Sequence, residues 1–509
     1  MKKNSSKYKF FICIFLIGAL DSCQISEEAS VNIADPLALE KIEGVKPMNV
    51  VFILSDDHRY DFMGFTGKVP FLKTPNMDRM AREGTHIQNA FVTTSLCSPS
   101  RASILTGQFS HRHQVIDNQS AIADSSTFFP QYLENAGYET AFFGKWHMGE
   151  HHARPRKGFT HWESFKGQGV YYNPTLNING EEKSFGDSTY ITDLLTEHAV
   201  DWIKGRDKEK PFFMYLSHKG VHSEFEPAQR HDDNYKNEAP SYPITMFPDN
   251  VTKDTYDFEN VPEWVKKQRY SWHGVDYMYH GQMDFDTFYR KYTETLLSVD
   301  ESIGEVISAL EREGVLENTL VFYMGDNGFS FGEHGLIDKR QAYEESIRVP
   351  MLAFGGGKLL AKDSVEQLIQ NIDIGPTVLA MAGLQKPPSM DGESFLQILK
   401  GETPAGWRER IYYEYFWERP FPQTPTVHAV RTDKYKFIRY YGLWDLNELY
   451  DLENDPYETQ NLIRSPQHQE IAKTLRNDIF DWLEETGGMQ IPLKRDRGVR
   501  FDHGYKGTY

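Results

Sequence analysis

The segment Asn49-Val50-Val51-Phe52-Ile53-Leu54-Ser55-Asp56-Asp57-His58 decides the fold. Its apolar run, residues 50–54, is typical of a strand that is buried on both faces, and polar residues follow directly. Three further segments of the chain have the same form. They are Tyr138 to Phe143 followed by Gly144-Lys145-Trp146-His147, Pro211 to Leu216 followed by Ser217-His218, and Leu320 to Met324 followed by Gly325-Asp326-Asn327-Gly328.

These segments predict an α/β fold. From about Lys46 to Gly392, short apolar runs alternate with helical patterns, which indicates a layered α/β domain. Ligands of open α/β sheets bind beyond the carboxyl ends of the strands, so we expect the four polar strand ends to meet at one edge. After about Gly401 the pattern changes and predicts a smaller α+β domain. Its elements are strands at 410–416, 427–431 and 435–440, a turn-rich connection at 448–462 and an amphipathic helix at 471–485.

Length and charge limit the classes of function. The chain has 509 residues, enough for two or three domains. It carries 55 Lys and Arg against 73 Asp and Glu, a formal net charge of −18. Nucleic acid is therefore excluded as a partner, because binding it requires clustered basic residues. An anionic substrate would need a local basic pocket.

The N-terminus is typical of an export signal. A basic start precedes the apolar core from Phe10 to Leu20, which is too short for a permanent membrane anchor. Leu20-Asp21-Ser22-Cys23 resembles a bacterial lipoprotein cleavage box, with Asp21 atypical. We expect a signal peptide at 1–22, lipidation at Cys23 as the one attachment to a membrane, and a tether at 23–46. Simple secretion with a free Cys23 is the alternative.

The three cysteines each have an explanation other than a disulfide. Cys13 lies in the signal and Cys23 at the cleavage box, while Cys97 lies in the run Cys97-Ser98-Pro99-Ser100-Arg101. This run predicts a loop over 95–98 that leads into a helix. A nucleophile at a helix N-terminus lies in a positive field that favours anions. Arg101, one turn later, shares its face of the helix.

Two pairs of polar residues indicate a metal site. Asp56 and Asp57 end one strand, and Asp326 and Asn327 end another. Adjacent carboxylates repel each other unless a cation lies between them, and hard divalent cations prefer carboxylate and amide oxygens. Two ordinary acidic turns are the alternative for either pair alone.

Together these motifs resemble the formylglycine-dependent sulfatases of the alkaline-phosphatase-like superfamily. The resemblance rests on C-x-P-x-R at Cys97 with its extension Ala102-Ser103-Ile104-Leu105-Thr106-Gly107, on Gly144-Lys145-Trp146-His147 and on Gly335-Leu336-Ile337-Asp338-Lys339-Arg340. It covers nearly the whole mature chain. It implies a large domain at 47–400 with a central mixed sheet between helices. A small domain with an antiparallel sheet would follow at 401–489, with a tail at 490–509.

The resemblance also implies a chemistry for these residues. A formylglycine-generating enzyme would oxidise Cys97 to an aldehyde, whose hydrate attacks the sulfate ester. One calcium ion would be held by Asp56, Asp57, Asp326, Asn327 and the modified Cys97. The expected roles of the other residues are support of the nucleophile for Arg101 and His147, sulfate binding for Lys145 and Lys339, and protonation of the leaving alcohol for His222. The family often has a proline two residues after this histidine, where this chain has Glu224, so His218 is the second candidate.

Two groups of residues are candidates for contact with a sugar. His111, His113 and Asp117 follow the motif helix and either contact a sugar or are ordinary loop residues. The long insertion at 231–292 is rich in aromatic residues, which either line a binding site or form a small core beneath the loop. These residues are Trp264, Trp272, His273, Tyr277, Tyr279 and His280.

The sequence therefore predicts an exported bacterial sulfatase, periplasmic or anchored as a lipoprotein at the cell surface. It would hydrolyse a sulfate ester on a polysaccharide or its oligosaccharides. An algal glycan such as ulvan is favoured over a glycosaminoglycan. The alternatives are a phosphate or phosphonate monoester hydrolase of the same superfamily, an inactive lipoprotein that binds sulfated glycans, and a protein that uses Cys97 as a thiol.

Overall fold

The structure of the protein is a computed structural model that describes residues 35–149, 152–281, 283–361 and 363–492. From Leu37 onward the described residues form one compact unit. The expected signal at 1–22, the expected lipidation point Cys23 and most of the tail at 490–509 lie outside the described residues. Within the described ranges, no helix has both the length and the apolar character that crossing a membrane requires.

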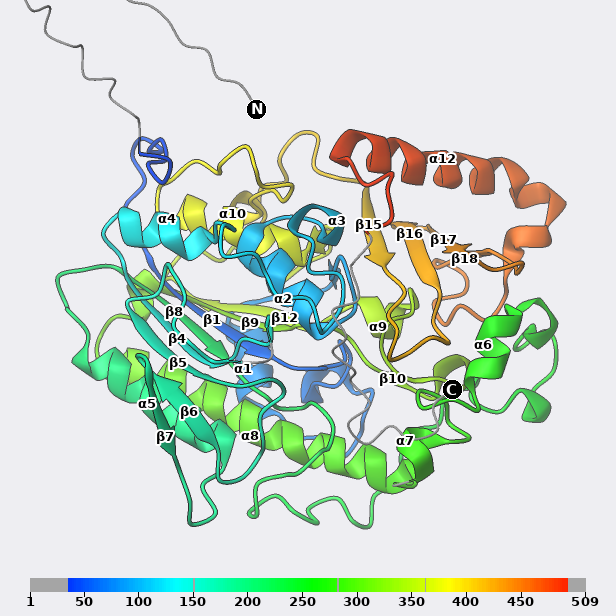
Figure 1. The fold of residues 1–509 in the computed structure, drawn as a ribbon, viewed down its shortest axis with the longest axis horizontal. Helices are drawn as coiled ribbons and strands as arrows, with labels where there is room; N and C mark the ends of the chain where they lie inside the picture. The colour runs from blue at the N-terminus through cyan, green and yellow to red at the C-terminus, as the bar shows by residue number, and fades with distance from the viewer. Residues whose placement is uncertain (1–34, 150–151, 282, 362, 493–509) are drawn as a thin grey trace, which may run out of the picture. The chain divides into compact units, whose positions relative to one another are not determined.

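A ten-stranded mixed sheet forms the centre of the large domain (Figure 1). Its strand order is β13 (Ser364–Val365), β2 (Thr85–Ile87), β12 (Met351–Gly355), β9 (Thr319–Gly325), β1 (Asn49–Ser55), β8 (Phe212–Ser217), β4 (Glu139–Lys145), β5 (His161–Phe165), β6 (Thr175–Ile178) and β7 (Glu181–Ser184). The four apolar runs of the sequence form the neighbouring strands β9, β1, β8 and β4, which are parallel. β12 runs antiparallel to β9. The predicted α/β fold with a mixed sheet is confirmed.

Helices cover both faces of this sheet (Figure 1). One face packs against α1 (Pro75–Glu83), α5 (Ile191–Gly205) and α8 (Phe285–Arg312), and the other against α2 (Cys97–Thr106), α4 (Phe129–Asn135) and α10 (Ile374–Met381). Side chains of β1 alternate between the two cores: Val51 and Ile53 enter the first, and Val50 and Phe52 enter the second. Burial on both faces explains why the strand is an unbroken apolar run.

Short elements complete the large domain and its insertion. They are β3 (Ala90–Phe91), α3 (Ser110–His113), α6 (Glu263–Gln268), α7 (Met278–Gly281), β10 (Ser330–Phe331), β11 (Ile337–Asp338), α9 (Glu344–Ile347), β14 (Ile369–Gln370) and α11 (Leu396–Leu399). β10 pairs with β11, which places the segment after β9 in a small hairpin.

The C-terminal part forms a separate antiparallel sheet that packs against one long helix. Its elements are β15 (Arg410–Tyr415), β16 (Thr426–Thr432), β17 (Tyr435–Tyr441), β18 (Glu448–Asp451) and α12 (Gln469–Thr486). The first three strands and the helix confirm the prediction. β18 corrects it, because these four residues were expected in a turn-rich connection. The buried Glu448 is stabilised there by the hydroxyls of Tyr343, Tyr440 and Tyr450, which donate to its carboxylate.

The expected tether at 23–46 also needs a correction. Ile42 N–H donates to the Gly383 carbonyl over 2.7 Å, and Gln385 N–H donates to the Glu40 carbonyl over 2.9 Å. Residues 40–42 are therefore bonded to the large domain. The domain boundary between residues 400 and 401 stays a prediction, since the described residues on both sides of it belong to one compact unit.

The small domain holds the segment that follows β11. Tyr413 on β15 donates its hydroxyl to the Arg340 carbonyl over 2.8 Å. Glu418, in the loop after β15, accepts a hydrogen bond of 2.6 Å from Arg340 Nε. Lys339 directly precedes this arginine, so the small domain fixes the position of a predicted site residue.

The N-terminus of α1 is anchored to α8 by one carboxylate. Asp300 accepts hydrogen bonds from the backbone N–H of Met77 (2.8 Å) and of Asn76 (3.1 Å) and from the Asn76 side chain (2.9 Å). These backbone donors belong to the first turn of α1, where a helix supplies no acceptors of its own.

We predict that Asp300→Ala lowers the free energy of unfolding by about 2 kcal/mol, because it leaves buried N–H groups without acceptors. Urea unfolding followed by tryptophan fluorescence measures this. Glu134→Ala, at an exposed position of α4, is the control and should be neutral. Equal midpoints for the two variants would contradict the anchoring role of Asp300.

Candidate active site

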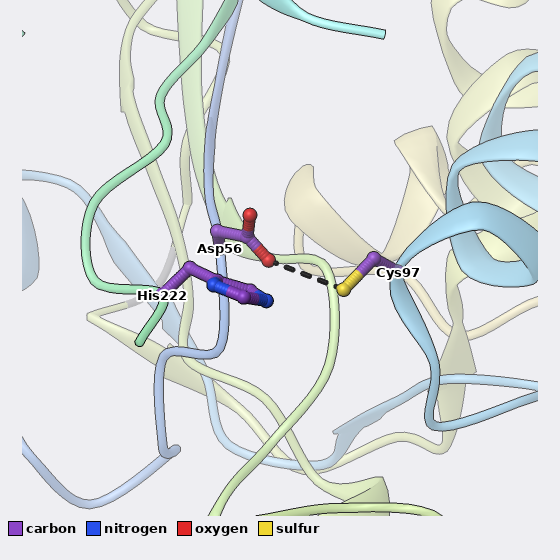
Figure 2. Close-up of side chains that lie close together, drawn as sticks. All are labelled: Asp56, Cys97 and His222. Atoms are coloured by element: carbon purple, nitrogen blue, oxygen red, sulfur yellow. Dashed lines mark hydrogen bonds between the residues drawn. The ribbon is translucent and has the colours of Figure 1, made fainter. Parts of the chain in front are cut away.

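The polar strand ends meet at one edge of the sheet, as the sequence predicted. Asp56 and Asp57 follow β1, Asp326 follows β9, and Lys145 ends β4. Cys97 faces them as the first residue of α2, so this helix begins within the segment 95–98 that was expected to be a loop. Figure 2 shows Asp56 and Cys97 pointing toward one another, with the ring of His222 beside them.

Three carboxylates form an acidic cluster at this edge. Oxygens of Asp56, Asp57 and Asp326 lie within 4.8 Å of one another, and all three residues are buried. Asp57 N–H donates to Asp326 over 3.0 Å, and Asn327 Nδ2 donates to Asp57 over 2.8 Å. Asp57 Oδ2 and Asn327 Oδ1 have no hydrogen-bond partner among the described residues. Three clustered carboxylates and an amide, with two buried oxygens that lack partners, fit a hard divalent cation.

The surroundings separate the pKa values of these acids. Burial raises the pKa of Asp57 to about 7, although Lys339 opposes this. Burial, with Asp56 nearby, also raises the pKa of Asp326. Burial acts in the same direction on Asp56, but Lys145 and the other cations beside it together outweigh burial and hold the pKa of that carboxyl well below its usual value. The charge of the cluster thus depends on the cations beside it.

Two lysines contact the cluster directly. Lys145 Nζ forms an ion pair with Asp56 and a hydrogen bond of 2.5 Å with Gln168 Oε1. Lys339 Nζ forms an ion pair with Asp57. Both lysines are buried. They form the local basic site that the acidic composition of the chain requires for an anionic substrate.

Arg101 is the third cation of the site. Its Nε donates to Asp326 over 2.9 Å, and its Nη1 donates to the Lys145 carbonyl over 2.7 Å and to Ser217 Oγ over 2.6 Å. The guanidinium therefore joins the helix that carries Cys97 to the ends of β9, β4 and β8. Arg101 lies on the Cys97 side of α2, as its spacing predicted.

Cys97 is a fully buried thiol, with Sγ 3.4 Å from Asp56 Oδ1. Burial, with Asp56 beside it, raises the pKa of this thiol. A reactive cysteine needs the opposite shift, since the thiolate is the nucleophile. The structure therefore argues against Cys97 acting as a thiol nucleophile.

The histidines differ in their position. His222 Nε2 lies 3.9 Å from Asp57 Oδ2, and Ser98 Oγ lies 3.3 Å from His147 Nδ1 beside the start of α2. His218 is fully buried, and its Nε2 lies 2.9 Å from Ser302 Oγ on α8. The geometry favours His222 over His218 as the histidine that faces a substrate.

The expected sugar-contacting residues behind α2 make structural contacts. His111 Nδ1 lies 2.9 Å from Glu414 Oε2, and His113 Nε2 lies 3.0 Å from Ser103 Oγ. The Asp117 carboxylate accepts from Gln119 N–H over 3.0 Å in its own turn. The structure does not bring these three residues to the acidic cluster, and their contact with substrate stays a prediction.

The aromatic residues of the insertion divide into two groups. Trp264 packs on Tyr440 of the small domain, and His273 is buried with its Nε2 3.0 Å from Asp338. Trp272 and Tyr279 instead line a cavity beside His222. Tyr277 is exposed, and the side chain of His280 lies outside what the structure describes.

Two polar residues of the site were not predicted from the sequence. Ser217 holds Arg101, and Gln168 holds Lys145. Ser217 lies in one of the polar strand ends, which was a usable signal. Gln168 lies in a loop without a motif, so the sequence offered none.

Comparison with known proteins identifies the family. The sulfatase family model matches residues 48–384, and the model of the C-terminal part of N-sulphoglucosamine sulphohydrolase matches residues 332–485. The chain is 32% identical over 510 residues to an N-acetylglucosamine-6-O-sulfatase of Bacteroides thetaiotaomicron, with 90% of this chain and 89% of that protein covered. It is 30% identical over 514 residues to the N-acetylglucosamine-6-sulfatase of Homo sapiens, with 91% and 88% covered.

The fold is also similar to that of a solved structure. The structure of a protein in complex with its substrate D-glucosamine-2-N,6-O-disulfate matches with a TM-score of 0.76 and 30% identity, over 88% of this chain and 100% of that one. The chain therefore belongs to the sulfatase family, whose members hydrolyse sulfate esters. This confirms the resemblance and the expected alkaline-phosphatase-like architecture.

We predict that chelator-treated protein binds Ca²⁺ and gains about 2.7 kcal/mol of stability at about one hundred times Kd. Asp326→Ala should lose this gain, because it removes one of the three clustered carboxylates. Calorimetric titration and thermal unfolding with and without Ca²⁺ measure both effects. Asp124→Ala, at an exposed acid, is the matched control. Equal stabilisation of the two variants would exclude the cluster as the binding site.

Proposed function

We propose that this sulfatase removes the 6-O-sulfate of a glucosamine residue in a sulfated saccharide. The observation that carries the proposal is the placement of Cys97 against an acidic cluster that Lys145, Lys339 and Arg101 neutralise. The choice of sugar is supported by the relatives, which are named for N-acetylglucosamine 6-sulfate and extend over nearly the whole chain. These names favour a glycosaminoglycan over the algal ulvan, which stays an untested alternative.

The nucleophile in this proposal is formylglycine, made from Cys97 by a formylglycine-generating enzyme. The hydrated aldehyde would supply an oxygen nucleophile where the buried thiol offers no thiolate. Asp56, Asp57, Asp326 and Asn327 would hold one calcium ion, together with the modified residue. A bound calcium ion supplies Lewis-acid polarisation of a sulfate oxygen.

The side chains of the site divide the remaining work. Lys145 and Lys339, whose ammonium groups contact the acidic cluster, would bind the sulfate oxygens, and Arg101 would hold the helix that carries the nucleophile. Cations held in advance in a buried site stabilise the charge of a transferring sulfuryl group without reorganisation. His222 is placed to give a proton to the leaving alcohol oxygen, which is otherwise a poor leaving group.

Two other functions are less well supported by these observations. A phosphate or phosphonate monoester hydrolase would share the fold, but the family match and the named relatives support sulfate. A lipoprotein that only binds sulfated glycans would not need a nucleophile precursor, an acidic cluster and both lysines together.

We further propose that the protein is exported and acts in the periplasm or as a lipoprotein at the cell surface. Residues 1–23 of the sequence, which are typical of an export signal with a lipoprotein cleavage box, support this proposal.

Release of inorganic sulfate tests the proposal. We expect release from N-acetylglucosamine 6-O-sulfate and none from ulvan oligosaccharides or a phosphate monoester. His222→Asn should lower kcat about a hundredfold or more. The loss should be smaller for an aryl sulfate, whose leaving group needs less protonation. Ion chromatography of sulfate measures each rate.

His218→Asn serves as the matched control, because this histidine bonds Ser302 behind the site. We expect a lower thermal midpoint with little change in kcat. The same leaving-group dependence in both variants would contradict the role of His222, and sulfate release from ulvan alone would contradict the proposed substrate.

A further inference from the structure

A cavity of about 670 Å³ opens beside the acidic cluster, a size that suits a small saccharide. It shares His222 with the cluster, and Gln168 in its wall contacts Lys145. The other residues that matter here are aromatic rings and one cation. They are Tyr171, Trp272, Tyr279 and Lys219.

Lys219 is the unusual member of this wall. The residue is 4% exposed and lines the cavity. Among the residues that the structure describes, its ammonium forms no ion pair. Its recorded contact is the ring of Tyr171, whose centroid lies 4.6 Å from Nζ. Burial, with Lys145 nearby, lowers the pKa of Lys219 to about 8, so the group remains mostly charged at neutral pH. A largely buried ammonium that forms no ion pair is stabilised by an anion that enters the cavity.

The neighbouring acids Asp56, Asp57 and Glu226 favour the charged form of Lys219 from a distance, but none of them forms an ion pair with it. Asp56 is paired with Lys145, and Asp57 with Lys339. Glu224 and Glu226 also line the cavity, but both are exposed, and neither forms an ion pair with Lys219. One ammonium group, that of Lys219, therefore lines a space suited to a sugar, together with the exposed carboxylates of Glu224 and Glu226.

We propose that Lys219 binds a second anionic substituent, a sulfate or a carboxylate, on the saccharide whose sulfate ester is cleaved. This inference rests on the proposed function and makes Lys219 a specificity residue. The enzyme then prefers saccharides with two anionic groups over those with one. His222, at the junction of cavity and cluster, lies between the sugar and the ester under attack.

Kinetics of Lys219→Met with three substrates test the proposal. The substrates are glucosamine-2-N,6-O-disulfate, N-acetylglucosamine 6-O-sulfate, and a disaccharide that joins the latter to a uronic acid. We expect the preference in kcat/KM for a doubly charged substrate to fall about tenfold through KM, as for the loss of one charge-assisted hydrogen bond. Lys219→Arg should keep most of it, and Lys236→Met, at an exposed position, should keep all of it.

The pattern across substrates identifies the substituent. A loss for the disulfate alone assigns sulfate to Lys219, and a loss for the uronic acid disaccharide alone assigns carboxylate. If Lys219→Met lowers kcat/KM for all three substrates by the same factor, Lys219 only supports the charge of the cluster and the proposal is overturned.

Binding without turnover separates this inference from the proposed function. In a Cys97→Ala background, calorimetric titration should show tighter binding of the disulfate or of the uronic acid disaccharide than of the monosulfate. Adding Lys219→Met should remove that difference. If the unaltered enzyme releases no sulfate, the proposed function fails while the binding preference is still measured. If the preference is absent from binding, the role of Lys219 fails by itself.

Discussion

Three carboxylates lie together in a buried site, and the architecture around them depends on balancing their charge. Like charges at such distances destabilise a fold strongly in a low dielectric, unless cations lie beside them. Lys145, Lys339 and Arg101 provide those cations from three separate parts of the chain. The parallel order of β9, β1, β8 and β4 makes this meeting feasible, because it brings the polar ends of all four strands to one edge.

The same constraint explains why the small domain belongs to the site. Lys339 lies in the short segment after β11, and Arg340 beside it is held by Tyr413 and Glu418 of the C-terminal sheet. A loop of this kind would place an ammonium group poorly by itself. The contacts to the sheet hold this loop in one conformation. Lys339 is therefore already placed beside Asp57, and little conformational entropy is lost when substrate binds.

Much of this could be predicted from the sequence, for identifiable reasons. The central strands are long apolar runs that end in polar residues. Such runs are typical of strands that are buried on both faces of a sheet, so their position in the fold could be predicted. The strand β18 could not be predicted, because its four residues include two acids. Glu448 is stabilised there partly by Tyr343, which is distant in the sequence, and no local pattern records this contact. Lys219 and Gln168 lie in loops, and their place in the cavity wall follows from packing that no local pattern records.

We propose that Cys97 is the precursor of the nucleophile and does not act as a thiol. Its burial beside Asp56 raises the pKa of the thiol, which disfavours the thiolate that a cysteine nucleophile needs. Mass spectrometry of the peptide that contains Cys97, from protein made in its native host, tests this most directly. We expect a peptide that reacts with a hydrazide and whose mass, once dehydrated, is lower than that of the cysteine form. A peptide with an unmodified thiol and no carbonyl reactivity would contradict it.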